Sequence, residues 1–193
     1  MINKITKNNI LSEINLVEEY YNTDPIALAV SGGPDSMAMM FLASQSKKIK
    51  KENVTILTVD HDLRKDSFKE ANIVMQNAKK IGFKCKILKW KGLKPTSGIQ
   101  EAARRSRYDM MLSWCKKNNV KKLFLAHHMD DQVETFLIRL SRGSGLKGLS
   151  AMKSLSKINN QVSLFRPLLD TQKQFLVKIS KIIFGKYFID PSN

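Results

Sequence analysis

One succession of strand, glycine turn and helix constrains the fold more than any other part of the sequence. Residues 26–30 are an uninterrupted apolar run, which predicts a strand buried on both faces of a parallel sheet. Gly32 and Gly33 follow and predict a turn, because glycine adopts backbone conformations that other residues avoid. Pro34 suits the first position of a helix, and the apolar residues 37–42 predict that this helix is buried.

The turn between this strand and this helix has the features of an anion site. Free N–H groups and the positive end of the helix dipole face the same point, which predicts a bound phosphate. The turn is not the common P-loop, because no lysine follows the glycines. Asp35 lies in the turn instead, and a carboxylate beside phosphates implies a bridging cation such as Mg²⁺. The alternative is an ordinary turn in which Asp35 and Ser36 cap the helix.

Composition narrows the class of protein. A chain of 193 residues suits one α/β domain, and a formal net charge of +16 predicts attraction to polyanions, nucleic acid first. Lysines scattered over a solvated surface are the alternative reading of this charge. No run reaches the ~18 apolar residues of a membrane span, and residues 1–10 lack the apolar core of a signal peptide. Cys85 and Cys115 lie far apart, as is typical of reduced thiols, so we expect a cytoplasmic protein.

Helical and strand-like segments alternate along the rest of the chain. We expect further strands at 54–59, 85–90 and 120–126, and helices at 1–22, 67–81, 99–118 and 173–184. In an open parallel sheet the ligand crevice lies beyond the carboxyl ends of the strands. Asp60 and His61 follow the second strand and are therefore expected at that edge. His61 either contacts a nucleotide or is an ordinary loop histidine.

One of these helices carries three arginines within a single turn. Arg104, Arg105 and Arg107 suit a clamp on phosphate groups. The alternative is ion pairing along the helix, because Glu101 and Asp109 lie three or four residues from the arginines. Spacing alone leaves both interpretations open.

A second carboxylate is expected beside Asp35. The strand at 120–126 is followed by His127, and Asp131 lies in the first turn of the next helix. Two carboxylates at the same sheet edge suit a Mg²⁺ site against a triphosphate, or one of them a base toward an attacking amine. A transition-metal site built from histidine and aspartate is the alternative. A basic, glycine-rich turn at 142–149 wraps a substrate phosphate, closes over the site or is an ordinary loop.

With these segments placed, the chain resembles the tRNA(Ile)-lysidine synthetase family, within the PP-loop superfamily of N-type ATP pyrophosphatases. The blocks that carry the resemblance are SGGPDS at 31–36, VDHDLR at 59–64, EAARRSRY at 101–108, AHHMDDQVET at 126–135, RLSRGSGLKGL at 139–149, RPLL at 166–169 and DPSN at 190–193. SGGPDS alone marks the wider superfamily, whereas the DDQVET and RGSGLKGL blocks are more specific. Together the blocks span nearly the whole chain.

The resemblance implies a Rossmann-like fold of the adenine nucleotide alpha hydrolase type, a parallel sheet with helices on both faces. It also implies a ligase that joins free L-lysine to C2 of the wobble cytidine in a tRNA(Ile) with a CAU anticodon. ATP and Mg²⁺ are required, the tRNA is adenylated as an intermediate, and AMP and pyrophosphate are released. The product is lysidine.

The resemblance also implies a role for individual residues. ATP binding falls to Ser31, Gly32, Gly33, Pro34, Asp35, Ser36, Asp60 and His61. Catalysis falls to Asp35, Asp131, His127, Arg104 and Arg105, with Asp35 and Asp131 also the metal ligands. RNA binding falls to Arg104, Arg105, Arg107, Arg142, Gly143, Ser144 and Gly145.

In one respect the chain departs from this family. Family members continue after DPSN into helical, tRNA-binding regions, whereas this sequence stops there. We therefore expect a lead-in helix at 1–22 and a PP-loop catalytic domain at 23–193, without the C-terminal tRNA-binding region. Apolar residues at 182–184 and Phe188 would then be exposed or would self-associate, for example in a homodimer.

Two other functions compete with lysidine formation. A tRNA thiolase of the same superfamily is disfavoured, because such enzymes usually carry catalytic cysteine pairs and this chain has none. A non-catalytic nucleotide-binding module is disfavoured by the paired aspartates and the arginine helix, which simple binding does not require.

Overall fold

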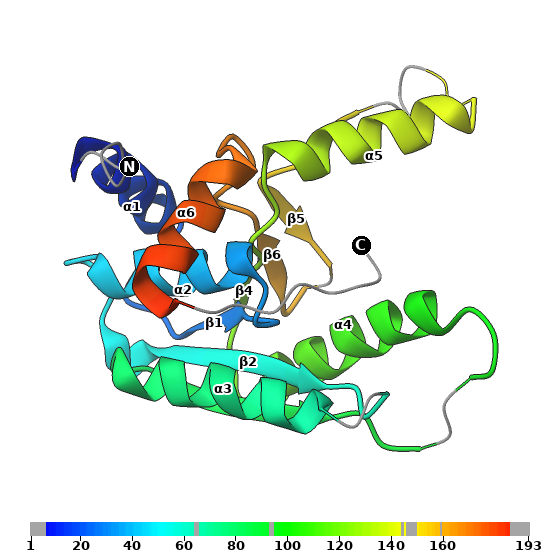
Figure 1. Ribbon diagram of the computed structural model, residues 1–193, viewed down its shortest axis with the longest axis horizontal. Helices are drawn as coiled ribbons and strands as arrows, with labels where there is room; N and C mark the ends of the chain where they lie inside the picture. Colours follow the sequence, from blue (N-terminus) through cyan, green and yellow to red (C-terminus); the bar gives the residue numbers. More distant parts are fainter. Residues whose placement is uncertain are drawn as a thin grey trace.

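The computed structural model describes residues 7–63, 66–92, 95–143, 145, 150–158 and 160–185. A six-stranded sheet with the order β3-β2-β1-β4-β6-β5 forms its centre (Figure 1). The strands are β1 (Ile26–Ala29), β2 (Val54–Asp60), β3 (Lys84–Lys89), β4 (Lys122–Phe124), β5 (Leu155–Lys157) and β6 (Ser163–Phe165). The helices are α1 (Lys7–Glu19), α2 (Pro34–Gln45), α3 (Ser67–Lys80), α4 (Ile99–Lys117), α5 (Met129–Ser141) and α6 (Lys173–Phe184), with a short 3₁₀ turn η1 (Lys51–Asn53).

Strands β1, β2, β3, β4 and β6 are parallel, as the sequence predicts, and β5 alone runs antiparallel, beside β6. The central strand β1 lies between β2 and β4, with Ile26 in register with Val54 on one side and Lys122 on the other. Because parallel strands end at the same edge, the turn after β1 meets the segments that follow β2 and β4.

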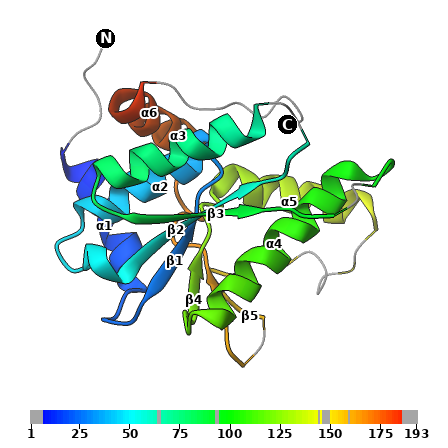
Figure 2. The same ribbon diagram turned by 90° about the horizontal axis from the view of Figure 1, so that it is seen from below.

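Helices cover both faces of the sheet, which confirms the Rossmann-like fold class (Figure 2). Alternate residues of β1 point to opposite faces of the sheet. Ile26 and Leu28 pack in a core with residues of α1, α2, α3 and α6. Ala27 packs on the other face with Met111 and Cys115 of α4. This two-sided burial explains why the β1 segment is apolar at every position.

Helix α1 contributes Ile14 and Val17 to the larger core, so it packs on the sheet domain through one face. The boundary at residues 22 and 23 stays a prediction. None of the helices in the described ranges combines the length and the apolar character that crossing a membrane requires.

Candidate active site

The turn after β1 is held in shape by its own backbone and two serines. Gly32 has a φ of 92°, a conformation that a side chain would strain. The Ser36 hydroxyl accepts a hydrogen bond from the Ser31 N–H at 3.2 Å and donates one to the Gly33 carbonyl at 3.0 Å. Gly33 is the N-cap of α2, and no side chain caps this helix. The first N–H groups of α2 therefore remain available to an anion, and the alternative of an Asp35 or Ser36 cap is not what the structure shows.

The segment after β4 brings a buried histidine between two carboxylates. The His128 Nε2 atom lies 3.5 Å from Oδ2 of Asp35, and its Nδ1 atom lies 3.6 Å from Oδ2 of Asp131. The His128 N–H also donates to the same Asp131 oxygen at 2.9 Å, which places this carboxylate at the start of α5. The His128 side chain is only 4% exposed. Asp35 and Asp131, predicted to converge, therefore face one imidazole.

The position of His128 between two carboxylates affects its pKa. Burial by itself lowers the pKa of His128, but the hydrogen bond with Asp35 and the charges of Asp131, Asp35 and Asp130 outweigh burial, so the pKa is raised above its ordinary value. The two carboxylates thus favour the protonated, positively charged form of the imidazole.

The same carboxylates suit a hard cation. Asp35 Oδ1 is buried and has no hydrogen-bond partner among the described residues, so one acceptor oxygen is left for a ligand. In the part of the chain that the structure describes, no group of three or more His, Cys, Asp or Glu side chains is placed to hold a metal. Mg²⁺ fits this donor set, because it is commonly bound by one or two carboxylates with phosphate oxygens and water completing its shell.

His127 lies in a different environment from its neighbour. Its Nδ1 accepts a hydrogen bond from Arg166 Nε at 3.2 Å. Burial lowers the pKa of His127 to about 4; Asp131 opposes this, while Arg166, Arg104 and Arg107 add to it. His127 is therefore neutral at pH 7.

The arginines of α4 do not all face the same way. The charges of Arg104 and Arg107, one turn apart, act on His127. Arg105 instead lines an open pocket of about 520 Å³ with Trp90, Glu101 and Asp109. The structure thus separates three residues that the sequence grouped as one clamp.

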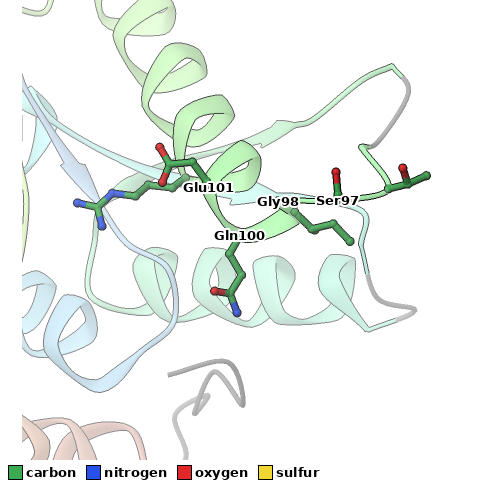
Figure 3. A pocket seen from close by; sticks show the side chains of 7 residues that line it. Ser97, Gly98, Gln100 and Glu101 are labelled. Atoms are coloured by element: carbon green, nitrogen blue, oxygen red, sulfur yellow. The ribbon is translucent and has the colours of Figure 1, made fainter.

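A neighbouring open pocket of about 550 Å³ lies at the first turns of α4 (Figure 3). Thr96, Ser97, Gly98 and Gln100 line it together with Arg104. Figure 3 shows that Gln100 and Glu101 point to different sides of the helix. Arg104 thus lines this pocket while its charge also acts on His127.

The segment after β2 reaches the same sheet edge. Asp60 is buried, and its Oδ1 accepts the N–H of Asp62 at 2.9 Å, so this carboxylate orders the turn. The ring of His61 meets the ring of Trp90 edge-on, with centroids 6.0 Å apart. Nucleotide contacts by Asp60 and His61 stay a prediction.

The glycine-rich turn after α5 is only partly described. Arg142, Gly143 and Gly145 are exposed, whereas Ser144 and residues 146–149 lie outside the described residues, as do Arg64, Phe188 and residues 190–193. Helix α5, which leads to this turn, extends away from the sheet (Figure 1) and buries none of its residues.

Two residues of the site were not singled out from the sequence. His128 and Arg166 lie inside the AHHMDDQVET and RPLL blocks, but the sequence alone indicates no role for either. The two consecutive histidines are a sequence signal for His128, because the side chain of either residue in such a pair after a strand can point into the site. No local signal marked Arg166, whose partner is distant in the chain.

Both cysteines are free thiols. Burial raises the pKa of Cys85 to about 11 and that of Cys115 to about 12, so both stay protonated at neutral pH. Protonated thiols are poor nucleophiles, which speaks against a role in sulfur transfer.

Together, the mostly parallel sheet and the uncapped glycine turn at its carboxyl edge define an α/β domain of the nucleotide-binding class. The sequence model of the PP-loop domain family matches residues 5–193. The chain therefore belongs to the PP-loop domain family.

Curated relatives give a narrower likeness. The chain is 45% identical over 176 residues to a tRNA(Ile)-lysidine synthase of Wolbachia pipientis wMel, covering 90% of this chain and 40% of that protein. It is 40% identical over 180 residues to a tRNA(Ile)-lysidine synthase of Bradyrhizobium diazoefficiens, covering 92% of this chain and 50% of that protein. The chain thus spans half or less of the length of these relatives.

Solved structures share the fold at low sequence identity. A U34-tRNA thiolase from Methanococcus maripaludis superposes with a TM-score of 0.78 at 18% identity, covering 97% of this chain and 69% of that one. An NMN synthetase from Francisella tularensis superposes with a TM-score of 0.60 at 11% identity, covering 93% of this chain and 71% of that one. These likenesses support the fold alone.

Proposed function

We propose that this chain carries the nucleotide-binding and catalytic site of an enzyme that forms lysidine in tRNA(Ile) with a CAU anticodon. ATP activates C2 of the wobble cytidine through an adenylated tRNA, and the ε-amine of free L-lysine then displaces AMP. The observation that carries the proposal is the convergence of Asp35 and Asp131 on His128 beside the uncapped N-terminus of α2. The similarity to tRNA(Ile)-lysidine synthases supports the choice of substrate.

Each part of the site has a task in this proposal. The turn from Ser31 to Ser36 offers its N–H groups to the ATP phosphates. Asp35 and Asp131 would hold Mg²⁺, which supplies charge neutralisation where pyrophosphate leaves. Arg104 and Arg107 would steady the RNA phosphate near the reacting base. The lysine amine must lose a proton when it attacks, and Asp131 is the carboxylate proposed to take it.

The experiment is transfer of radiolabelled lysine to a tRNA(Ile) transcript with a CAU anticodon, in the presence of ATP and Mg²⁺. The matched control is the same transcript with uridine at the wobble position. Incorporation that requires the cytidine supports the proposal and shows that these residues suffice. Absence of incorporation with intact ATP binding contradicts that sufficiency, and loss of both contradicts the nucleotide site itself.

A further inference from the structure

Arg166 and His127 leave the sheet side by side. Strands β4 and β6 are parallel neighbours, and the Leu125 N–H donates to the Phe165 carbonyl at 2.8 Å just beyond their pairing. The next residues of each segment therefore emerge together at the carboxyl edge, close to the first turn of α5, which contains Asp131. This placement comes from the sheet and not from a flexible loop.

The contact between the two side chains decides where the imidazole proton lies. Arg166 Nε lies 3.2 Å from His127 Nδ1, and a guanidinium nitrogen can only donate. Nδ1 must therefore present its lone pair. A neutral imidazole with an accepting Nδ1 carries its proton on Nε2.

The guanidinium is itself fixed from the other side. Arg166 Nη1 donates to the Lys153 carbonyl at 3.0 Å and to the Ser156 hydroxyl at 2.8 Å, and the Arg166 N–H donates to the Ser154 carbonyl at 2.8 Å. Strand β5 and the two residues that precede it thus hold the guanidinium so that Nε points at His127. Strand β5 therefore orients Arg166 in addition to extending the sheet.

We propose that Arg166 is a positioning residue that holds His127 as the neutral Nε2–H tautomer, so that His127 acts in the site as a hydrogen-bond donor and not as a base. The role of this donor in catalysis rests on the proposed function, whereas the tautomer does not. An Nε2–H group can donate to an acceptor oxygen of the substrate. The proton of the attacking amine then has to go to a carboxylate.

The charges that face His127 agree with a neutral ring. The charges of Arg104 and Arg107 on α4 and of Arg166 after β6 act on the ring, and Asp131 on α5 is the acidic group that acts on it. Burial of the ring, together with three cations against one carboxylate, disfavours a second proton on it.

The direct test is the nitrogen NMR spectrum of the ¹⁵N-histidine-labelled chain at pH 7. We expect His127 to show a protonated Nε2 and an unprotonated Nδ1. Arg166→Met should give a mixture of tautomers, and Arg166→Lys, which keeps a donor, should restore much of the Nε2–H form. Arg104→Gln is the matched control, since it removes a cation near the ring without touching Nδ1, and the tautomer should stay unchanged. A wild-type spectrum with protonated Nδ1 overturns the proposal, as does an Arg166→Met spectrum identical to that of the wild type.

A second measurement asks whether Arg166 acts through His127. In the lysine-transfer assay, Arg166→Met and His127→Ala should each reduce kcat by a similar factor, and the double variant should lose no more than either single variant. Independent, multiplying losses would contradict the proposal. If the chain transfers no lysine and binds no ATP, the proposed function fails, whereas the tautomer is still decided by the NMR spectra.

Discussion

The imidazole Nε2 of His128 lies 3.5 Å from Oδ2 of Asp35, which connects the segment after β4 to the glycine turn after β1. On its other side the same ring lies 3.6 Å from Asp131. Since β1 and β4 are adjacent parallel strands, both segments leave the sheet at one edge. Two carboxylates from distant parts of the sequence are thereby held beside an uncapped helix N-terminus.

The two carboxylates should be needed for chemistry and not for folding. Asp35→Asn and Asp131→Asn are each expected to reduce lysine transfer by about 100-fold or more, because they remove a metal ligand or a base at nearly constant shape. Circular dichroism should show an unchanged fold. Asp130→Asn is the control, since this neighbouring side chain is exposed and neither contact to His128 is its own. Full activity in either of the first two variants would refute the assignment.

Gly32 and Gly33 should respond differently to alanine. Gly32 has a φ of 92°, so Gly32→Ala is expected to lower the free energy of unfolding by about 1–2 kcal/mol. Gly33 has a φ of −69°, which any residue adopts, so Gly33→Ala should leave stability nearly unchanged while its new methyl group weakens ATP binding. Thermal unfolding and calorimetric titration with ATP separate the two effects. Equal loss of stability in both variants would show that the turn differs from this description.

His127 should make the protein less stable in mild acid. Its pKa is lowered from 6.5 to about 4, so between these values the unfolded chain binds more protons than the folded one. The free energy of unfolding attributable to His127 therefore falls as the pH drops from 6.5 to 4, by about 2–4 kcal/mol in total. The measurement is urea unfolding of the wild type and His127→Gln across this range, and the difference between them should shrink toward acid pH. A constant difference would contradict a buried neutral imidazole.

Arg104 and Arg105 should not be equivalent. The charge of Arg104 acts on His127, whereas Arg105 lines a pocket with Asp109, a carboxylate that does not line the pocket of Arg104. We expect Arg104→Gln to reduce kcat/KM for tRNA about tenfold or more, and Arg105→Gln to reduce it by less than threefold, since a partly neutralised arginine offers less to a phosphate. Steady-state kinetics at low salt provide the measurement. A larger loss for Arg105→Gln would reverse the proposed orientation of α4 toward the RNA.

Much of this arrangement was predictable because it is encoded locally. The apolar run at β1, the turn glycines and the end of α6 at Gly185 are short-range signals, and the structure has α6 at Lys173–Phe184 as the periodicity predicts. The edge position of β3 follows from its alternation of lysines with apolar residues. The convergence of Asp35 and Asp131 followed from the rule that ligands bind at the carboxyl edge of a parallel sheet.

The rest depended on contacts between distant segments. Strand β5 has only three residues and is stabilised by its pairing with β6. Such a short segment shows no hydrophobic periodicity from which a strand could be predicted. The sequence indicates His127 but not His128, because the direction of each ring depends on a partner that is distant in the chain, Arg166 for His127 and Asp35 for His128. The apolar residues of α5, such as Val133, Leu137 and Leu140, are exposed, and amphipathic spacing alone does not say whether an apolar stripe is covered.

The most direct test of the central claim is to identify what becomes of ATP when the chain acts on tRNA(Ile). With α-labelled and γ-labelled ATP, Mg²⁺, lysine and the transcript, chromatography should show AMP and pyrophosphate, each formed in equal amount to the lysine incorporated. Both products should disappear with the wobble-uridine transcript and with Asp35→Asn. Formation of ADP and phosphate would contradict cleavage between the α- and β-phosphates, and with it the role assigned to the turn that follows β1.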